Sequence, residues 1–348
     1  MTVGGAPFDW LMAGLGAWLL GGLYLDGWAH IHVPALETFF TPWHAVLYSG
    51  YVANAAALVV TFCRNRRRGA ARSRALPAGY RLSLVGVFIF FFAGVADMLW
   101  HVAFGIEDGV EGLISPSHLA LALGGGLIVT GPLRAGLRGP VVPNPTWLSR
   151  MPMVVSMTLV LSLITFFTEY ASPYGTTWVS QAAASGTQGE AFVYQSVGLA
   201  GFLVQAAVLM ALVLFVLRSR PLPVGSLTTL LSVNVALMAI IHDKYLDTGP
   251  YPLIGAAVLA GLIGDALLWW LRPSPVRPRA FRTVAFAIPA VQYLGYFVAV
   301  MWWAHVTWSV HLWTGAIVIA GGVGWLVSYL VVAPRLGLAP APPSIPER

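Results

Sequence analysis

The chain has 348 residues, of which 58% are hydrophobic and 9% are charged, and its formal net charge is +6. A soluble protein of this size carries about 25% charged residues, so the composition excludes an ordinary soluble globular protein. The single cysteine, Cys63, excludes an internal disulfide. Apolar runs of about twenty residues, each long enough to cross a bilayer core of about 30 Å, recur along the chain. They predict an all-α, polytopic transmembrane helical bundle.

The apolar runs define about ten membrane spans. In chain order they cover residues 9–29, 42–63, 80–104, 115–134, 151–171, 192–217, 226–242, 252–271, 283–304 and 310–333. Arginine residues follow every second span, from Arg64 after the second to Arg335 after the tenth. Because basic loops stay in the cytoplasm, we expect a multi-pass protein of the cell (inner) membrane with both termini in the cytoplasm.

The net positive charge is explained by this topology, because basic loops determine which way the protein is oriented in the membrane. No aromatic-rich RNA-binding motif accompanies the basic residues, so we expect no nucleic-acid partner. Membrane lipid is the expected surrounding. The same topology places all eight histidines toward the extracytoplasmic side, at the turns that lead from odd-numbered to even-numbered spans.

The first of these outer turns carries a set of metal-competent residues. Asp26 and His30 are four residues apart near the end of the first span, so they share one face of a helix. His44, in the string "FTPWH", opens the returning span, and Pro42 suits the first turn of that helix. A helical hairpin would bring the three side chains to one point. We call Asp26, His30 and His44 the first triad.

The second outer turn repeats the pattern. Asp97 and His101 are again four residues apart, and His118, in the string "ISPSH", opens the next span. We call Asp97, His101 and His118 the second triad. Two copies of one spacing predict two metal sites that lie toward the extracytoplasmic face.

Further residues are candidates for supporting roles. Glu37 and Glu111 each precede the last histidine of a triad by seven residues, and they could act as further ligands, as acceptors that orient an imidazole, or as a catalytic base. Additional ligands or proton-relay groups are expected from the outer ends of later spans if the bundle folds back: His242, Asp243, His305 and His311. Aromatic residues near the triads would line a pocket or form an interfacial belt: Trp28, Phe39, Phe40, Trp100 and Phe104.

The organisation of the chain follows from these features. Residues 1–134 are expected to form a four-span metal-binding repeat, and residues 135–150 a basic cytoplasmic loop. Residues 151–334 would form a six-span bundle, and residues 335–348 a proline-rich cytoplasmic tail. The glycine-rich runs are interpreted as close helix contacts rather than nucleotide-binding loops.

The two hairpins resemble a known family. "DGWAH" followed by "FFTPWHAVLY", and "DMLWH" followed by "ISPSHLAL", are similar to the metal motifs in the C subunit of the copper membrane monooxygenases, which include particulate methane and ammonia monooxygenases. The resemblance covers roughly residues 20–130. It implies that each triad holds copper, and that the chain works with partner subunits or as a homo-oligomer. Trp43 stands where the family pattern has serine.

Three classes of function agree with these residues. The first is a copper-dependent oxygenase, or a subunit of one, that oxidises a small apolar substrate; imidazole and carboxylate ligands suit copper, and also iron and zinc. The second is a zinc-dependent membrane lipid hydrolase with Glu37 or Glu111 as the base. The third is a metal carrier or transporter, which is disfavoured because transport sites usually lie near the membrane midplane.

Overall fold

The chain forms an all-α bundle in the computed structural model, which describes residues 4–33, 40–105, 109–139, 146–176, 178–180 and 188–333. Within those ranges there is no β-strand, and the prediction of an all-α fold is confirmed. The α-helices are α1 (Ala6–His32), α2 (Pro42–Arg67), α3 (Arg81–Phe104), α4 (Val110–Ile114), α5 (Pro116–Val129), α6 (Gly131–Arg138), α7 (Trp147–Phe167), α8 (Gln188–Leu217), α9 (Ser226–Ile241), α10 (Pro250–Leu271), α11 (Pro278–Trp303) and α12 (Val310–Val331). Short 3-10 helices are η1 (Arg72–Arg74), η2 (Glu169–Ala171) and η3 (Asp243–Tyr245).

Each predicted span has a helical counterpart. Eight of the described helices are long and apolar enough to cross a membrane: α1, α2, α3, α7, α8, α10, α11 and α12. The fourth predicted span is divided into α5 and α6, which meet at an angle of 41°. Pro132, in the first turn of α6, lacks the N–H that would continue α5, and this explains the bend. The seventh span is α9, a shorter apolar helix of 16 residues.

The hairpin of α1 and α2 is tightly packed through two glycines. A Cβ added to Gly22 would lie 2.6 Å from Cα of Leu47, and one added to Gly50 would lie 2.8 Å from Cα of Leu19. Small residues of this kind let two helix backbones approach closely inside a membrane. They hold the end of α1 against the beginning of α2, where the first triad lies.

The hairpin of α3 and α5 uses the same device. A Cβ at Gly86 would lie 2.6 Å from the carbonyl oxygen of Gly124, and one at Gly124 would lie 2.7 Å from the backbone nitrogen of Phe90. Gly50 and Gly124 each follow the last histidine of a triad by six residues. The internal repeat therefore includes the packing of the hairpins as well as their polar residues.

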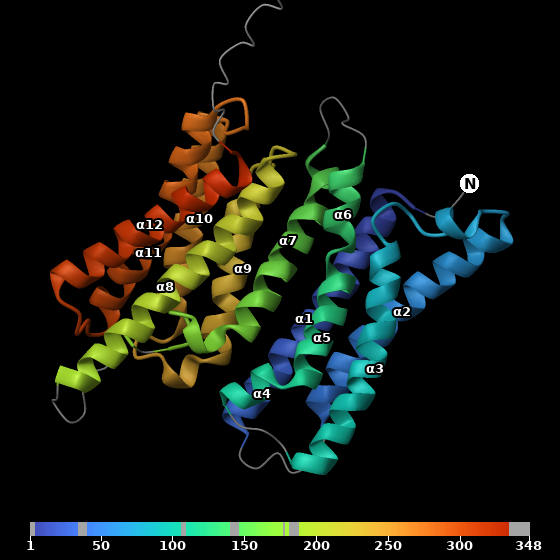
Figure 1. Cartoon of the computed structure of the whole chain (residues 1–348), viewed down its shortest axis with the longest axis horizontal. Helices are drawn as coiled ribbons and strands as arrows, with labels where there is room; N and C mark the ends of the chain where they lie inside the picture. Colours follow the sequence, from blue (N-terminus) through green and yellow to red (C-terminus); the bar gives the residue numbers. More distant parts are fainter. Residues whose placement is uncertain are drawn as a thin grey trace, which may run out of the picture.

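α7 lies between the two parts of the bundle (Figure 1), with α1, α5 and α6 on one side and α9 on the other. α8 to α12 form the other part, in which α10 packs against α9 and α11, and α12 against α8 and α11. The ends of α1 and α3 and the beginnings of α2 and α5 all lie at the lower end of the bundle in Figure 1. The boundaries of the four predicted segments of the chain stay a prediction.

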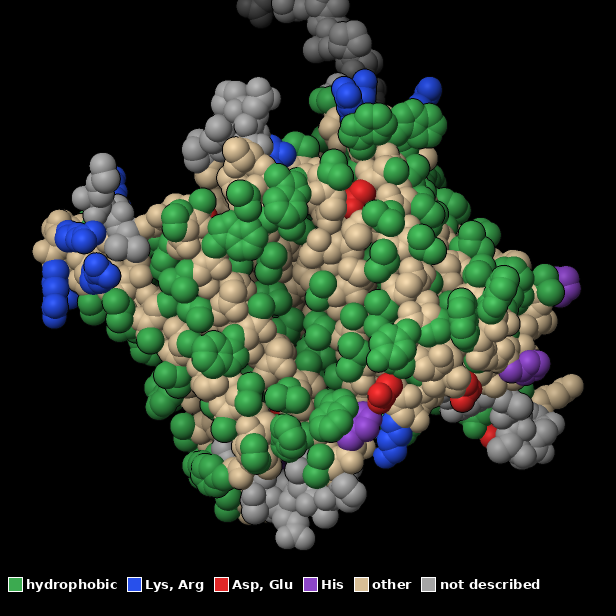
Figure 2. Space-filling model, turned by 180° about the vertical axis from the view of Figure 1, so that it is seen from behind, with side chains coloured by type: hydrophobic (Ala, Val, Ile, Leu, Met, Phe, Trp, Pro, Cys, Tyr) green, Lys and Arg blue, Asp and Glu red, His purple; other side chains and the backbone are tan. Residues whose placement is uncertain are grey.

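The surface has the character expected of a membrane protein. In Figure 2 hydrophobic side chains cover the middle of the molecule, and the visible Lys and Arg side chains lie along its upper part, with one exception at the lower edge. Near the basic end, Asp265 is buried and accepts hydrogen bonds from the backbone nitrogens of Leu227 and Thr228, each at 3.0 Å. This carboxylate satisfies donors at the beginning of α9. Which end faces the cytoplasm stays a prediction.

Candidate metal centre

The first triad forms at the corner between α1 and α2. Nε2 of His44 lies 3.3 Å from Oδ2 of Asp26, and Nε2 of His30 lies 3.7 Å from the same oxygen. Thr41 is the N-cap of α2, and its Oγ1 accepts a hydrogen bond from the backbone nitrogen of His44 at 3.1 Å. The cap fixes the first turn of α2, and this turn directs the His44 ring toward α1.

The second triad has the same construction between α3 and α5, with the short helix α4 inserted in the turn. Nε2 of His118 lies 3.2 Å from Oδ1 of Asp97, and Nε2 of His101 lies 3.6 Å from Oδ2. The Asp97 side chain is only 2% exposed, whereas that of Asp26 in the first triad is 11% exposed. In each triad one ligand atom per residue can be chosen so that all three lie within 4.8 Å of one another.

Hydrogen bonds orient the imidazole rings. Nδ1 of His44 is hydrogen-bonded to Oγ1 of Thr41 at 3.1 Å, and Nδ1 of His118 to Oγ of Ser115 at 2.8 Å. Nδ1 of His101 donates to the carbonyl oxygen of Gly105 at 3.3 Å. A metal-binding histidine usually donates its second ring N–H in this way, which fixes the tautomer and leaves Nε2 as the ligand atom.

The geometry of these groups fits a bound cation. Because a carbonyl oxygen only accepts hydrogen bonds, Nδ1 of His101 carries a proton, and Nε2 is the ring atom that faces the Asp97 carboxylate. A proton or a metal cation between Nε2 and the carboxylate oxygen would hold these two atoms together. Metal–ligand bonds of about 2.0–2.1 Å in a tetrahedron separate neighbouring ligand atoms by about 3.3 Å, which is close to the Nε2–O distances in both triads.

A buried oxygen atom supports the same interpretation. Oδ1 of Asp26 is buried and accepts no hydrogen bond from any residue that the structure describes, whereas Oδ1 of Asp97 faces Nε2 of His118 at 3.2 Å. A buried carboxylate oxygen without a partner is costly and needs an ion or water to satisfy it. The donor set of two imidazoles and one carboxylate suits copper, iron or zinc.

Both triads lie on the wall of one cavity of about 480 Å³. All six side chains line it, and the charges of Asp97 and His118 are close enough to act on Asp26. The cavity is bounded by α1, α2, α3, α5 and α7, so the two hairpins lie beside each other with their ligand residues facing a shared space.

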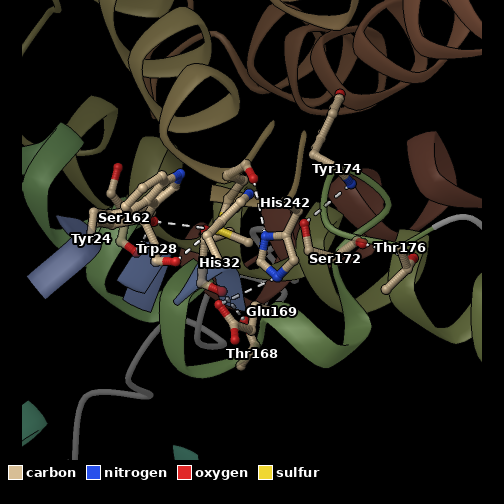
Figure 3. Close-up of polar contacts among 12 residues, drawn as sticks. Tyr24, Trp28, His32, Ser162, Thr168, Glu169, Ser172, Tyr174, Thr176 and His242 are labelled. Atoms are coloured by element: carbon tan, nitrogen blue, oxygen red, sulfur yellow. Dashed lines mark hydrogen bonds and ion pairs between the residues drawn. The ribbon is translucent and has the colours of Figure 1, made fainter. Parts of the chain in front are cut away.

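A second polar pair, Glu169 and His242, also lines the cavity. Figure 3 shows the two side chains turned toward each other. Nε2 of His242 is 3.8 Å from Oε2 of Glu169, and Nδ1 of His242 donates to the carbonyl oxygen of Met238 at 3.1 Å. Burial raises the pKa of Glu169 from 4.5 to about 7 and lowers the pKa of His242. Both shifts favour the neutral forms, so the pair can exchange a proton with a molecule in the cavity.

The other predicted residues lie elsewhere. Glu37 is outside the described residues, and Glu111 is exposed on α4, where Gly112 and Leu113 line the cavity instead. His242 contacts Glu169 rather than a triad. Asp243, which is 46% exposed, pairs with Nε2 of His32 at 2.9 Å. The later spans are predicted to bring further histidines to the site. The remaining two, His305 and His311, are instead exposed on the surface and do not line the cavity.

The aromatic lining also differs from the prediction. Phe40 and Phe104 are 81% and 72% exposed, and Trp28 stacks on His32 at 4.7 Å between ring centroids. Trp100 does not line the cavity, and Phe39 lies outside the described residues. The aromatic lining comes instead from deeper positions: Tyr48, Phe90, Phe166 and Phe167, with Tyr245 near the polar end.

Sequence reasoning did not single out Thr41, Ser115 or Glu169 as site residues. The first two had a signal, because the strings "TPWH" and "SPSH" both place a hydroxyl residue three positions before the histidine, where a helix N-cap is expected. Glu169 had only a weak signal, as an acidic residue at the outer end of a predicted span. Its partner, His242, is 73 positions further along the chain.

Comparison with protein-family models, curated proteins and solved structures found no match to this chain. The arrangement of its own residues is therefore the basis for assigning a function. What these residues establish is a multi-pass helical protein of membrane-like character with two Asp-His-His groups able to hold a metal ion.

Proposed function

We propose that the chain is a membrane-embedded, copper-dependent oxygenase, or a subunit of one, that acts on an apolar substrate near its extracytoplasmic face. One observation carries the proposal: two Asp-His-His triads, built on equivalent helical hairpins, line a single cavity whose remaining wall is largely apolar. The resemblance of both hairpins to the C subunit of copper membrane monooxygenases supports copper, and it supports assembly with partner subunits or as a homo-oligomer.

The residues have distinct roles in this proposal. Each triad offers two imidazole nitrogens and a carboxylate oxygen, a set that leaves coordination positions open for a small molecule. Copper held there would supply the activation of dioxygen. One oxygen atom would enter a C–H bond of the substrate and the other would leave as water, with two electrons and two protons from an external reductant. The apolar wall would exclude bulk water, and Glu169 with His242 would hold or release a proton.

A zinc-dependent membrane lipid hydrolase is the second candidate, because Glu169 places a carboxyl group on the same cavity wall. Zinc hydrolases use such a group as the base beside a metal-bound water. The exposed position of Glu111 makes that residue a poorer base than Glu169. A transporter is disfavoured because both triads lie at one end of the bundle, whereas transport sites usually lie near the midplane.

Metal analysis tests the proposal. Protein purified without chelators is expected to hold two equivalents of copper, and the double variant His44→Ala, His118→Ala is expected to lose both. A matched double variant, His305→Ala, His311→Ala, removes two exposed histidines away from the cavity and should keep the metal.

The outcomes separate the candidate functions. One tight equivalent of zinc, together with hydrolysis of lipid, would favour the hydrolase. Full metal content in the His44→Ala, His118→Ala variant would overturn the assignment of the triads as the metal site. For the oxygenase, consumption of dioxygen with a reductant and an apolar substrate should be lost in the same variant and kept in the control.

A further inference from the structure

The cavity has one polar end and one apolar end. The triads, Glu169 and His242 form the end near the helix corners. From there the lining becomes apolar toward the interior of the bundle, apart from the Tyr48 hydroxyl, and it reaches Leu19, Phe90 and Val129, each less than 5% exposed. A ligand that fills this space must have a polar or reactive end and an apolar remainder.

The depth of the cavity follows from the helices that line it. Lining residues run from His101 back to Phe90 on α3 and from His118 to Val129 on α5. With a rise of about 1.5 Å per residue, each of these stretches is roughly 16 Å long. The stretch from Ile31 to Leu19 on α1 gives a similar length.

The cavity is wide enough for an extended hydrocarbon chain. A volume of about 480 Å³ spread over a depth of roughly 16 Å corresponds to a mean cross-section of roughly 30 Å², and a space of this section accepts such a chain.

We propose that the cavity binds one unbranched alkyl chain, with one end of the chain at the two triads and the other between Leu19, Phe90 and Val129. The orientation of the reacting end rests on the proposed function, whereas the binding of the chain does not. An extended chain zigzags and advances somewhat less than the C–C bond length of about 1.5 Å per carbon, so the depth accommodates roughly ten to twelve carbons. The substrate class is therefore a medium-chain alkyl compound rather than a molecule of one or two carbons.

Gly125 provides a direct test because it lines the cavity on α5, seven residues below His118. A Cβ at this position would meet only the ring of Phe90, at 3.7 Å, which is ordinary contact, and because Gly125 lines the cavity we expect the rest of a leucine side chain to occupy it. Gly14 is the matched control: it lies exposed on α1, and nothing lies within 4 Å of an added Cβ.

The probe is a series of 1-alkanols of increasing length, with binding measured as thermal stabilisation of the protein in lipid nanodiscs. For the wild type and Gly14→Leu, affinity should rise about fourfold per methylene, the equivalent of about 0.8 kcal/mol, up to roughly ten to twelve carbons. For Gly125→Leu the rise should stop near half that length. Comparison between the variants removes the contribution of alkanol that merely dissolves in the bilayer.

Each result has a clear meaning. An equal chain-length dependence in Gly125→Leu and Gly14→Leu, or no dependence in the wild type, would overturn the proposal. A diacyl lipid that co-purifies with the wild type, resists 1-alkanols and is lost in Gly125→Leu would overturn the single-chain assignment. The series is repeated on chelated protein, where the dependence should persist. A protein that binds chains but no metal would refute the proposed function alone, and a protein that binds metal but not chains would refute this inference alone.

Discussion

The packing of α3 against α5 predicts that Gly124→Ala will empty the second triad while the fold remains. The added Cβ would lie 2.7 Å from the backbone nitrogen of Phe90 and 2.9 Å from its Cα. Because these are backbone atoms of a helix, they cannot move individually, and restoring ordinary contact at 3.4 Å requires the helices to separate by about 0.7 Å. Metal–ligand distances tolerate changes of only about 0.2 Å, so His118 would no longer share an ion with Asp97.

The size of the effect follows from the cost of overpacking. Inserting a methyl group into a close-packed contact costs about 1–3 kcal/mol. In the variant, the bound metal must hold the two helices at their original distance. The overpacking cost is then subtracted from the free energy of metal binding, and this weakens the binding about 5- to 150-fold. The first triad, on α1 and α2, is not affected. We therefore expect the variant to keep half of the wild-type metal.

The measurement is metal content after purification, followed by titration of the chelated protein with copper or zinc. The control is Gly125→Ala, one position further along α5, where a Cβ lies 3.7 Å from the nearest atom of Phe90. This variant should bind two ions with the wild-type affinity. Two ions bound with wild-type affinity by Gly124→Ala would refute the argument that the close contact of α3 and α5 maintains the second triad.

Three further predictions follow from the site and its surroundings. Thr41→Val and Ser115→Ala remove the hydroxyl groups that are hydrogen-bonded to Nδ1 of His44 and His118. Each variant should weaken the binding of one ion about 10- to 100-fold in a metal titration. Thr41→Ser keeps the hydroxyl group and should bind with wild-type affinity. Because burial raises the pKa of Glu169 from 4.5 to about 7, the native state holds a proton that the unfolded state has lost across this range. Stability should therefore fall by about 3 kcal/mol as pH rises from about 4.5 to 7, and melting of chelated protein should show a larger fall in wild type than in Glu169→Gln. Asp265→Ala leaves the backbone donors of α9 unpaired and should lower stability by about 2 kcal/mol, with metal content unchanged.

Local patterns in the sequence were enough to predict the fold class and the composition of the two triads. An Asp and a His four residues apart must share a helix face, and a Pro two positions before a His indicates that a helix begins there. These rules act within a single turn of helix, and the return of the chain between two successive membrane spans brings Asp97 and His101 together with His118. The membrane spans could be predicted in the same way, because they depend on apolar length alone.

Contacts between distant parts of the chain could not be predicted in this way. Glu169 meets His242 only because α7 and α9 pack against each other, and no spacing in the sequence records that contact. The aromatic residues chosen for the pocket, such as Phe104, are near the triads in sequence but face outward. Phe90 faces inward because α3 presents that side to α5, and this orientation is a property of the helix pair.

The unequal burial of the two triads has a consequence for the rate at which they exchange ions. The His30 side chain of the first triad is 37% exposed, whereas the Asp97 and His101 side chains of the second are 2% and 8% exposed. A chelator can approach the first triad through His30, whereas the most exposed side chain of the second triad, His118, is 22% exposed. Ions should therefore leave in two phases, a faster one from the first triad and a slower one from the second, and local opening of α3 and α5 would speed the slower phase.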